Sequence, residues 1–346
     1  NRRMHNKSFT VDNQVSIVGG RNIADEYFEL LTDAEFVDFD MLAVGPVAAE
    51  VSVTFDRFWN HKLSVPVEAL DKKKDLPDLE TARANLDKEA VKKSESIYAR
   101  ALNSLLMHRI TEDKLALYPA ESRVITDDPD KLLNEVSAEQ KVLLTALAQQ
   151  VDEAVSEVIV ISPYFIPGKN GVEYWRSITN KGVRVIVVTN SLATNNHVPV
   201  HSAYARYRHD MLAAGVELYE VRVDAAKEPP DDAKTAYDTV TLHTKMALMD
   251  RRYTLVGSLN LDPRSIDINT EFGVFVDNAD LAGSLTERVL EVLPSAAYRV
   301  TENEKGKLRW TVEIDGQTVV EKNEPQTSGW LRFKAFLSRI VPEKQL

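Results

Sequence analysis

Short apolar runs alternate with helical stretches through the second half of the chain. The runs predict six strands, at Val158–Ile161, Gly182–Thr189, Gly215–Val221, Leu242–Met249, Thr254–Val256 and Phe272–Val276. Apolar residues at helical spacing predict helices at Val172–Asn180 and Val200–Ala214. Strands that alternate with helices are typical of a layered α/β domain with a parallel or mixed sheet.

The first half shows the end of the same pattern without its beginning. We expect strands at Ser8–Val11, Val15–Val18, Met41–Val44 and Arg123–Ile125. The charged stretch Asp71–Lys93 is interpreted as a solvent-exposed connecting segment. We expect it to be mostly helical after Pro77, with the helix continuing to about His108. A helix from about Ala138 to Val155 then leads into the second half.

The C-terminal residues form a third region. Alternating runs at Lys307–Ile314 and Gln317–Lys322 flank Asp315-Gly316, a strong signal for a two-residue hairpin. Within Trp330–Val341, one helical face is apolar (Trp330, Phe333, Phe336, Leu337, Ile340, Val341) and the other is polar (Arg332, Lys334, Ser338, Arg339). This pattern suits a helix at a membrane interface or a helix docked on the core. We therefore expect three regions, at 1–137, 138–300 and 301–346.

Composition narrows the function classes. The 346 residues are 44% hydrophobic and 27% charged, as in ordinary globular proteins. A net charge of −11 argues against a long basic groove for duplex nucleic acid. The absence of cysteine excludes thiolate metal sites and cysteine nucleophiles. No apolar run reaches the 18 residues that a membrane-spanning helix needs.

One pattern occurs twice. His5, Lys7 and Asp12 form H-x-K-x4-D, and His243, Lys245 and Asp250 repeat it. Each aspartate is followed at the same spacing by a pair of small residues and then an asparagine: Gly19-Gly20 with Asn22, and Gly257-Ser258 with Asn260. Two matches with the same downstream spacing are far rarer than a single chance match, so the repeat indicates function.

The spacing suggests a phosphate site. Residues i and i+2 of a strand point to the same face, so each His–Lys pair projects into one pocket. Gly20 and Ser258 would allow close approach of a ligand, and the amides of Asn22 and Asn260 would donate to its oxygens. Two such halves facing each other would surround one tetrahedral oxyanion with a nucleophile and an acid.

The duplicated motif resembles that of the phospholipase D superfamily. Ser162–Gly168, Thr189-Asn190-Ser191 and the segment from His201 to Glu220 are similar to bacterial cardiolipin synthases, and RRMHNKSFTVD with the amphipathic tail resembles their C-type members. The resemblance implies two similar α/β sandwich halves with mixed sheets flanked by helices. The first half is then truncated, because about 85 residues of sheet and helix precede His243 and none of them precede His5. We expect an upstream portion of comparable length in the natural polypeptide, since a lone edge strand leaves an incomplete core.

The resemblance also implies a mechanism. One histidine attacks phosphorus to form a phosphohistidine, and the other acts as acid and then base. We assign His5 as nucleophile and His243 as acid/base, with Lys7, Lys245, Asn22 and Asn260 on the phosphate oxygens. No metal or other cofactor is expected, because the ammonium groups offset the developing charge.

A carboxylate is expected to fix the far nitrogen of each histidine. The resemblance places Glu271 in this role in the second copy. In the first copy the counterpart is Asp38 or Asp40, with Asp38 preferred. Asp12 and Asp250 are expected to be structural.

The leading functional hypothesis is a cardiolipin synthase-type phosphatidyl transferase. The expected substrates are phosphatidylglycerol and, as a second candidate, phosphatidylethanolamine, with peripheral contact at the cytoplasmic face of a bacterial inner membrane and no nucleic acid. Hydrolytic phospholipase D is the nearest alternative. A nuclease of the superfamily and a non-enzymatic lipid-binding protein are the more distant ones.

Overall fold

The computed structural model describes residues 2–28, 35–70, 77–92, 102, 104–112, 114–133, 137, 140–225 and 239–346. The chain divides into two compact units, Arg57–Pro119 and the remainder. The smaller unit contains α2 (Val67–Leu70), α3 (Leu79–Lys92) and α5 (Leu105–Thr111). The helix expected after Pro77 is confirmed over α3, whereas the expectations for 71–76 and 93–101 lie outside the described residues. The remaining helices and strands begin in the larger unit.

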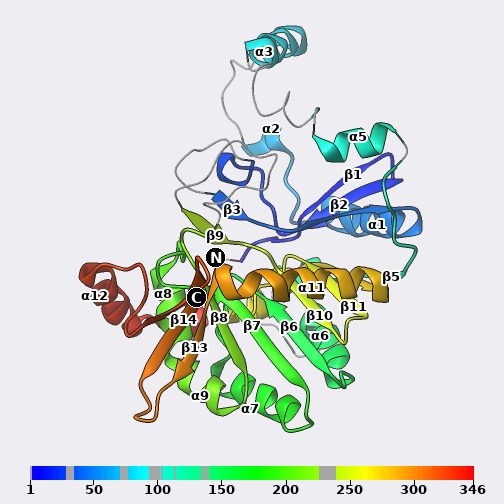
Figure 1. Cartoon of the computed structure of the whole chain (residues 1–346). Helices are drawn as coiled ribbons and strands as arrows, with labels where there is room; N and C mark the ends of the chain where they lie inside the picture. Colours follow the sequence, from blue (N-terminus) through cyan, green and yellow to red (C-terminus); the bar gives the residue numbers. More distant parts are fainter. Residues whose placement is uncertain are drawn as a thin grey trace. The chain divides into compact units, whose positions relative to one another are not determined.

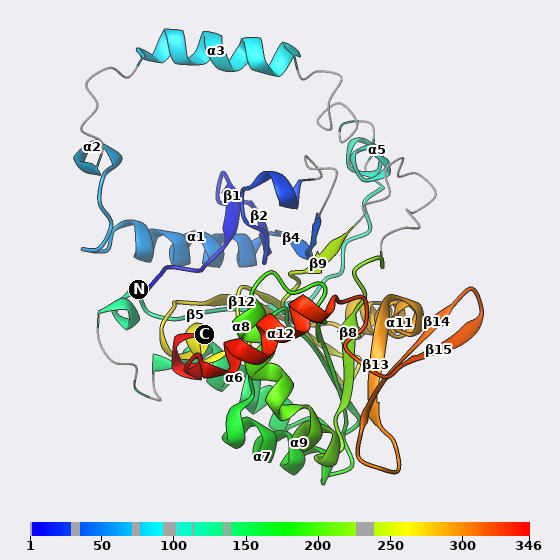
Figure 2. The same ribbon diagram turned by 90° about the vertical axis from the view of Figure 1, so that its left-hand side faces the viewer.

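A ten-stranded mixed sheet dominates the larger unit (Figures 1 and 2). In spatial order its strands are β15 (Gln317–Glu321), β14 (Leu308–Ile314), β13 (Ala297–Glu302), β8 (Glu217–Val221), β7 (Arg184–Asn190), β6 (Glu157–Ile161), β10 (Met246–Met249), β11 (Tyr253–Gly257), β12 (Phe272–Asp277) and β5 (Glu121–Thr126). The three strands β6, β7 and β8 are parallel, and the other pairs are antiparallel. The expected mixed α/β fold is confirmed.

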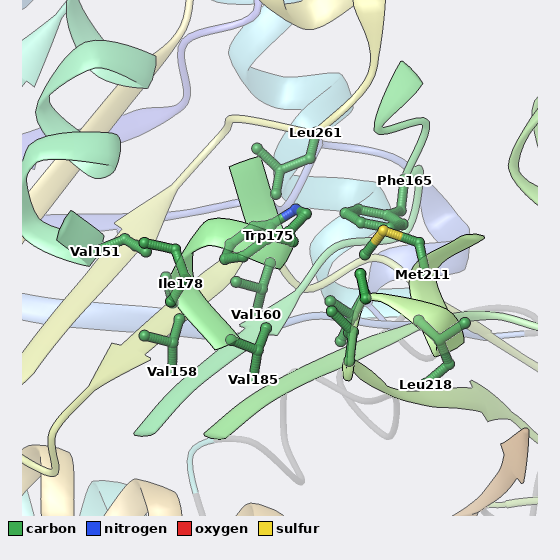
Figure 3. Close-up of a cluster of buried hydrophobic side chains, with 14 of the residues drawn as sticks. Val151, Val158, Val160, Phe165, Trp175, Ile178, Val185, Met211, Leu218 and Leu261 are labelled. Carbon is green, nitrogen blue, oxygen red and sulfur yellow. The ribbon is translucent and has the colours of Figure 1, made fainter. Parts of the chain in front are cut away.

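Helices cover both faces of this sheet. They are α6 (Val142–Asp152), α7 (Gly168–Thr179), α8 (Val198–Tyr204), α9 (Arg208–Ala213) and α11 (Ala279–Ala296). In β6, Val158 and Val160 pack with Trp175 of α7 in the cluster drawn in Figure 3. The alternate residues of β6, Ile159 and Ile161, belong to the cluster that contains Leu293 of α11. Burial on both faces explains why the central strands are apolar throughout.

The structure differs from the expected elements at several points. The single helix expected over Val200–Ala214 is divided into α8 and α9 by a 3₁₀ turn at Ala205–Tyr207. The strand expected at Leu242–Met249 is divided into β9 (Val240–Leu242) and β10. Neither α11 nor β13 was predicted from the sequence. The C-terminal hairpin is confirmed, with positive φ at its two turn residues.

A smaller sheet follows His5 and Lys7 of the first motif. It has the order β1 (Ser8–Val11), β2 (Val15–Gly19) and β4 (Asp40–Val44), followed by helix α1 (Pro46–Trp59), while β3 (Glu35–Val37) pairs in parallel with β9. The β1–β2 hairpin repeats the register of β10–β11, since Ser8 pairs with Val18 and Met246 pairs with Val256. These four positions have the same offsets from their motif histidines, so the sequence repeat is also a structural repeat.

One face of the small sheet is apolar and exposed. Phe9, Ile17 and Leu42 lie side by side across it and are 62%, 42% and 40% exposed. Their counterparts across β10, β11 and β12 (Ala247, Leu255, Phe275) are buried in the core beside the helices. Strand β1 is also an edge strand, whereas β10 pairs with β6 on the corresponding side. The two repeats therefore differ in burial at equivalent positions.

The predicted boundaries of the three regions also stay a prediction. Strand β5, which lies before residue 138, pairs with β12 in the large sheet. Strands β13 to β15 extend the same sheet from β8.

Buried ion pairs attach the C-terminal residues to the second half. The Arg208 guanidinium binds the Glu220 carboxylate at 2.7 Å and the Glu324 carboxylate at 2.5 Å. Trp310 donates from its indole N–H to the other oxygen of Glu220 at 2.9 Å. Because Arg208 and Glu220 are almost completely buried, each depends on the other to offset the cost of removing a charge from water.

Candidate active site

The first motif is held by residues from the second half. The backbone N–H of His5 donates to the Thr270 carbonyl oxygen at 3.1 Å. Its imidazole Nδ1 lies 2.9 Å from Oε2 and 3.1 Å from Oε1 of Glu271. Among the described contacts none involves Nε2 of His5, and the His5 side chain is 24% exposed.

The second motif mirrors this arrangement. The backbone N–H of His243 donates to the Val37 carbonyl oxygen at 2.7 Å, and that of Thr244 donates to the same oxygen at 3.1 Å. Nδ1 of His243 lies 2.7 Å from Oδ2 of Asp38. Val37 and Thr270 each immediately precede the carboxylate residue that binds the imidazole, so the two arrangements are equivalent.

The carboxylates are exchanged between the halves, which corrects the expected pairing. The sequence analysis assigns Glu271 to His243 and a first-half aspartate to His5, each within its own copy. In the structure Glu271 binds His5 and Asp38 binds His243. The exchange arises because each motif histidine hydrogen-bonds, through its backbone N–H, to the residue that precedes the carboxylate of the other half.

Contacts and register distinguish Asp38 from Asp40. Oδ2 of Asp40 accepts a hydrogen bond from Nε of Arg21 at 2.5 Å. Asp38 stands two residues before the partner of Gly19 in β2, as Glu271 stands two residues before the partner of Gly257 in β11. Asp38 is therefore the structural counterpart of Glu271.

Gly20 and Ser258 both lie beside the carboxylates, and the close approach of a phosphate at these positions stays a prediction. A Cβ at Gly20 would lie only 2.6 Å from a carboxylate oxygen of Asp38, so glycine makes room for this carboxylate. The Ser258 hydroxyl donates to Oε2 of Glu271 at 2.5 Å and accepts from the Phe272 N–H at 3.0 Å. Both positions therefore serve the histidine-orienting carboxylates.

A buried ion pair is hydrogen-bonded to the backbone of Glu271. The Lys131 ammonium binds Oδ2 of Asp127 at 2.6 Å, and both side chains are buried. The same Asp127 oxygen accepts from the backbone N–H of Glu271 at 3.0 Å. Sequence reasoning missed this pair, since its only sequence signal is an aspartate and a lysine four residues apart.

The two lysines take equivalent positions. The Lys7 ammonium donates to the His5 carbonyl oxygen at 2.7 Å, and that of Lys245 donates to the His243 carbonyl oxygen at 2.5 Å. Both His-x-Lys segments lie just before a strand rather than within one, as the division of β9 from β10 shows. The expected closeness of His and Lys is thus achieved by the lysine reaching back to the histidine backbone.

The two asparagines differ in their contacts. Nδ2 of Asn22 donates to the Tyr27 hydroxyl at 3.0 Å. Nδ2 of Asn260 lies 3.4 Å from the Ser265 hydroxyl, and the buried Oδ1 of Asn260 has no hydrogen-bond partner among the residues that the structure describes. Their contact with phosphate stays a prediction.

The motif aspartates begin hairpin turns. Asp12 and Asp250 both have φ of 52°, in the left-handed region that aspartate tolerates better than most residues. Oδ1 of Asp250 accepts from the backbone N–H groups of Ser156 and Glu157, and Oδ2 accepts from that of Val155. The contacts of Asp250 are those of a structural residue, and the turn geometry is repeated at Asp12.

Burial and like charges set the protonation states. Burial, followed by the Lys245 and Lys7 charges, lowers the pKa of His243 far below its usual range, and His5 adds to this effect. Burial lowers the pKa of Lys7 to about 8, opposed by Glu271 and Asp38. It also lowers the pKa of Lys245 and raises that of Asp38. Groups from both motifs act on one another, so the motifs share one electrostatic environment.

Tyr27 is a site residue that sequence reasoning missed. Its hydroxyl lies 3.2 Å from Nε2 of His243, the nitrogen that Asp38 leaves free. Its ring stacks on Phe36 at 4.7 Å and meets the His243 ring edge-on at 5.0 Å. No motif signal marks Tyr27, because its place follows only from the path of the chain after β2.

The described residues contain no group of three or more His, Asp and Glu arranged to hold a metal ion. The expectation that the reaction needs no metal stays a prediction.

Comparisons with known proteins identify a matching family and similar sequences. The sequence model of the family described as "Cardiolipin synthase, PLD-like domain" matches residues 147–292. Cardiolipin synthase C of Escherichia coli (strain K12) is 35% identical over 353 residues, covering 100% of this chain and 73% of that protein. An uncharacterized protein of Helicobacter pylori (strain ATCC 700392 / 26695) is 32% identical, covering 100% of this chain and 68% of its own length.

A solved structure also matches. The crystal structure of phosphatidylserine synthase from Haemophilus influenzae Rd KW20 has a TM-score of 0.52 at 14% identity, covering 86% of this chain and 62% of that one. This likeness supports the fold alone.

Proposed function

Because the chain belongs to the cardiolipin synthase group of the phospholipase D superfamily, we propose that it makes cardiolipin by transferring a phosphatidyl group through a phosphohistidine. The observation that carries the proposal is the pair of imidazoles, each with Nδ1 held by a carboxylate from the opposite half. This arrangement keeps the proton on Nδ1 and directs each Nε2 to the substrate.

His5 is the nucleophile in this proposal. Its Nε2 attacks phosphorus while the bond to the departing headgroup alcohol breaks, and His243 gives that alcohol a proton. The hydroxyl of phosphatidylglycerol then gives its proton to Nε2 of His243 and attacks the phosphohistidine. The greater exposure of the His5 side chain, 24% against 7% for His243, supports this order.

In this proposal the bound phosphate raises the pKa of His243, the acid/base group. Without substrate, the lowered pKa keeps His243 neutral. A phosphate anion between the motifs brings negative charge beside the imidazoles and raises the pKa of His243. Lys7 and Lys245 then offset the charge that develops on the non-bridging oxygens.

We also propose peripheral contact with the cytoplasmic face of a bacterial inner membrane through α12 (Gly329–Leu337) and the turn that follows it. Trp330, Phe336 and Ile340 are 67%, 60% and 84% exposed. The Ser202 hydroxyl of α8 donates to the Ala335 carbonyl oxygen at 2.7 Å, so the helix is attached to the core on one side while its aromatic residues are exposed. No helix in the described part of the chain is long and apolar enough to cross a bilayer.

The test uses purified protein, labelled phosphatidylethanolamine and unlabelled phosphatidylglycerol in mixed micelles. We expect labelled cardiolipin from the wild type and from His209→Ala, a control at a surface histidine. His243→Ala should lose it. Phosphatidic acid as the sole product would indicate a hydrolytic phospholipase D, and no turnover of either lipid would overturn the proposal.

A further inference from the structure

A hydroxyl group already occupies the place where the acceptor alcohol must be activated. Since Nδ1 of His243 donates to Asp38, its Nε2 is the acceptor nitrogen, and the Tyr27 hydroxyl lies 3.2 Å from it. The same oxygen accepts from Nδ2 of Asn22 at 3.0 Å. An acceptor alcohol needs the first of these contacts, because it gives its proton to Nε2 of His243 while its oxygen approaches phosphorus.

The surroundings hold Tyr27 in this position. Its side chain is 5% exposed, and its ring lies nearly parallel to that of Phe36, at 13°. Both rings meet the His243 ring close to perpendicular, at 75° and 81°. Burial raises the pKa of Tyr27 to about 12, so its hydroxyl keeps its proton at neutral pH.

We propose that Tyr27 selects the acceptor of the second step, favouring a lipid alcohol over water at Nε2 of His243. The inference rests on the proposed function. Water that displaces the phenol gains only the contacts that the phenol loses. A lipid alcohol also brings the remainder of its headgroup and chains, and their binding compensates for moving Tyr27.

Both outcomes of the second step follow the same chemistry. In transfer, the bond between phosphorus and His5 breaks, a bond from phosphorus to the lipid oxygen forms, and the alcohol proton moves to Nε2 of His243. In hydrolysis, the oxygen and the proton come from water, and phosphatidic acid is released. Tyr27 acts before either bond changes, so it alters the ratio of the two products.

The test measures the ratio of phosphatidic acid to cardiolipin made by the full chain. Tyr27→Phe keeps the ring and removes the hydroxyl, while Tyr27→Ala removes both. Tyr174→Phe is the matched control, because the Tyr174 hydroxyl of α7 donates to the Ala148 carbonyl oxygen of α6 rather than to a histidine. A second measurement supplies donor lipid alone and follows release of phosphatidic acid.

We expect Tyr27→Phe to raise the ratio about fivefold, the factor for losing one ordinary hydrogen bond. Tyr27→Ala should raise it further, and Tyr174→Phe should leave it unchanged. With donor lipid alone, both Tyr27 variants should release phosphatidic acid faster than the wild type.

Three results would overturn the inference. The first is an unchanged ratio in both Tyr27 variants. The second is complete loss of turnover in a Tyr27→Phe protein with an intact circular dichroism spectrum, since selecting an acceptor is not required to form the phosphohistidine. The third is a wild type that turns over no phospholipid, which would overturn the proposed function as well; the first two leave that function standing.

Discussion

Asp38 accepts a hydrogen bond from Nδ1 of His243, which lies 205 residues later in the chain, at 2.7 Å. The equivalent bond in the other direction joins His5 to Glu271 across 266 residues. Neither half of the repeat therefore contains a complete histidine–carboxylate pair. The site depends on the two halves being packed together, and each half orients the imidazole of the other.

Asp38→Asn tests this exchange. The amide carries no charge to stabilise the imidazolium of His243, so we expect kcat/KM for cardiolipin formation to fall about 100-fold. Asp40→Asn is the control, because Asp40 binds Arg21 and should cost far less. A larger loss from Asp40→Asn would mean that the orienting carboxylate has been misassigned.

A substrate with a good leaving group separates the roles of the two histidines. Bis-p-nitrophenyl phosphate needs no acid to expel nitrophenolate, so His243→Ala should still release about one equivalent in a burst. His5→Ala should show no burst, because it lacks the nucleophile. A burst from His5→Ala and none from His243→Ala would reverse the assignment.

The pH dependence of kcat/KM should show the deprotonation of the Lys7 ammonium. Its pKa of about 8 means that its ammonium loses its proton as the pH rises through this value. The loss weakens phosphate binding, and kcat/KM reports groups of the free enzyme, so Lys7 should cause a fall in kcat/KM above about pH 8. Burial lowers the pKa of Lys245 to about 7, which adds an earlier decline in the wild type and the variants alike. In Lys7→Arg the charge persists and the fall should shift to higher pH, whereas Lys169→Arg on the surface should leave the profile unchanged. A wild-type profile that stays flat to pH 10 would contradict this role.

The α12 surface predicts binding to anionic vesicles. Trp330→Ser combined with Phe336→Ser should weaken sedimentation with phosphatidylglycerol vesicles more than tenfold, since a buried aromatic side chain contributes about 1.5–3 kcal/mol. The control combines Val155→Ser and Val320→Ser, which change two exposed apolar residues elsewhere. Equal binding by both double variants would rule out α12 as the contact.

The ion pairs of Arg208 with Glu220 and Glu324 should affect the stability of the fold and not the catalysed reaction. Arg208→Met leaves the buried carboxylate of Glu220 without its cation, which should cost about 3–5 kcal/mol of unfolding free energy. Adding Glu220→Gln should recover part of the loss, because the uncompensated charge is removed. Thermal and urea unfolding of the single and double variants would measure both effects, and an Arg208→Met protein as stable as the wild type would refute them.

The sequence alone determined most strands of the second half, the C-terminal hairpin and the duplicated motif residues, because hydrophobic period, turn chemistry and residue spacing are local properties. It could not determine that the carboxylates are exchanged, that β9 and β10 separate at His243, or that Tyr27 reaches Nε2 of His243. These features follow from contacts between residues far apart in the chain, such as the two backbone hydrogen bonds to the Val37 carbonyl. Local spacing specifies which groups are present, whereas the packing of one half against the other decides which imidazole each carboxylate meets.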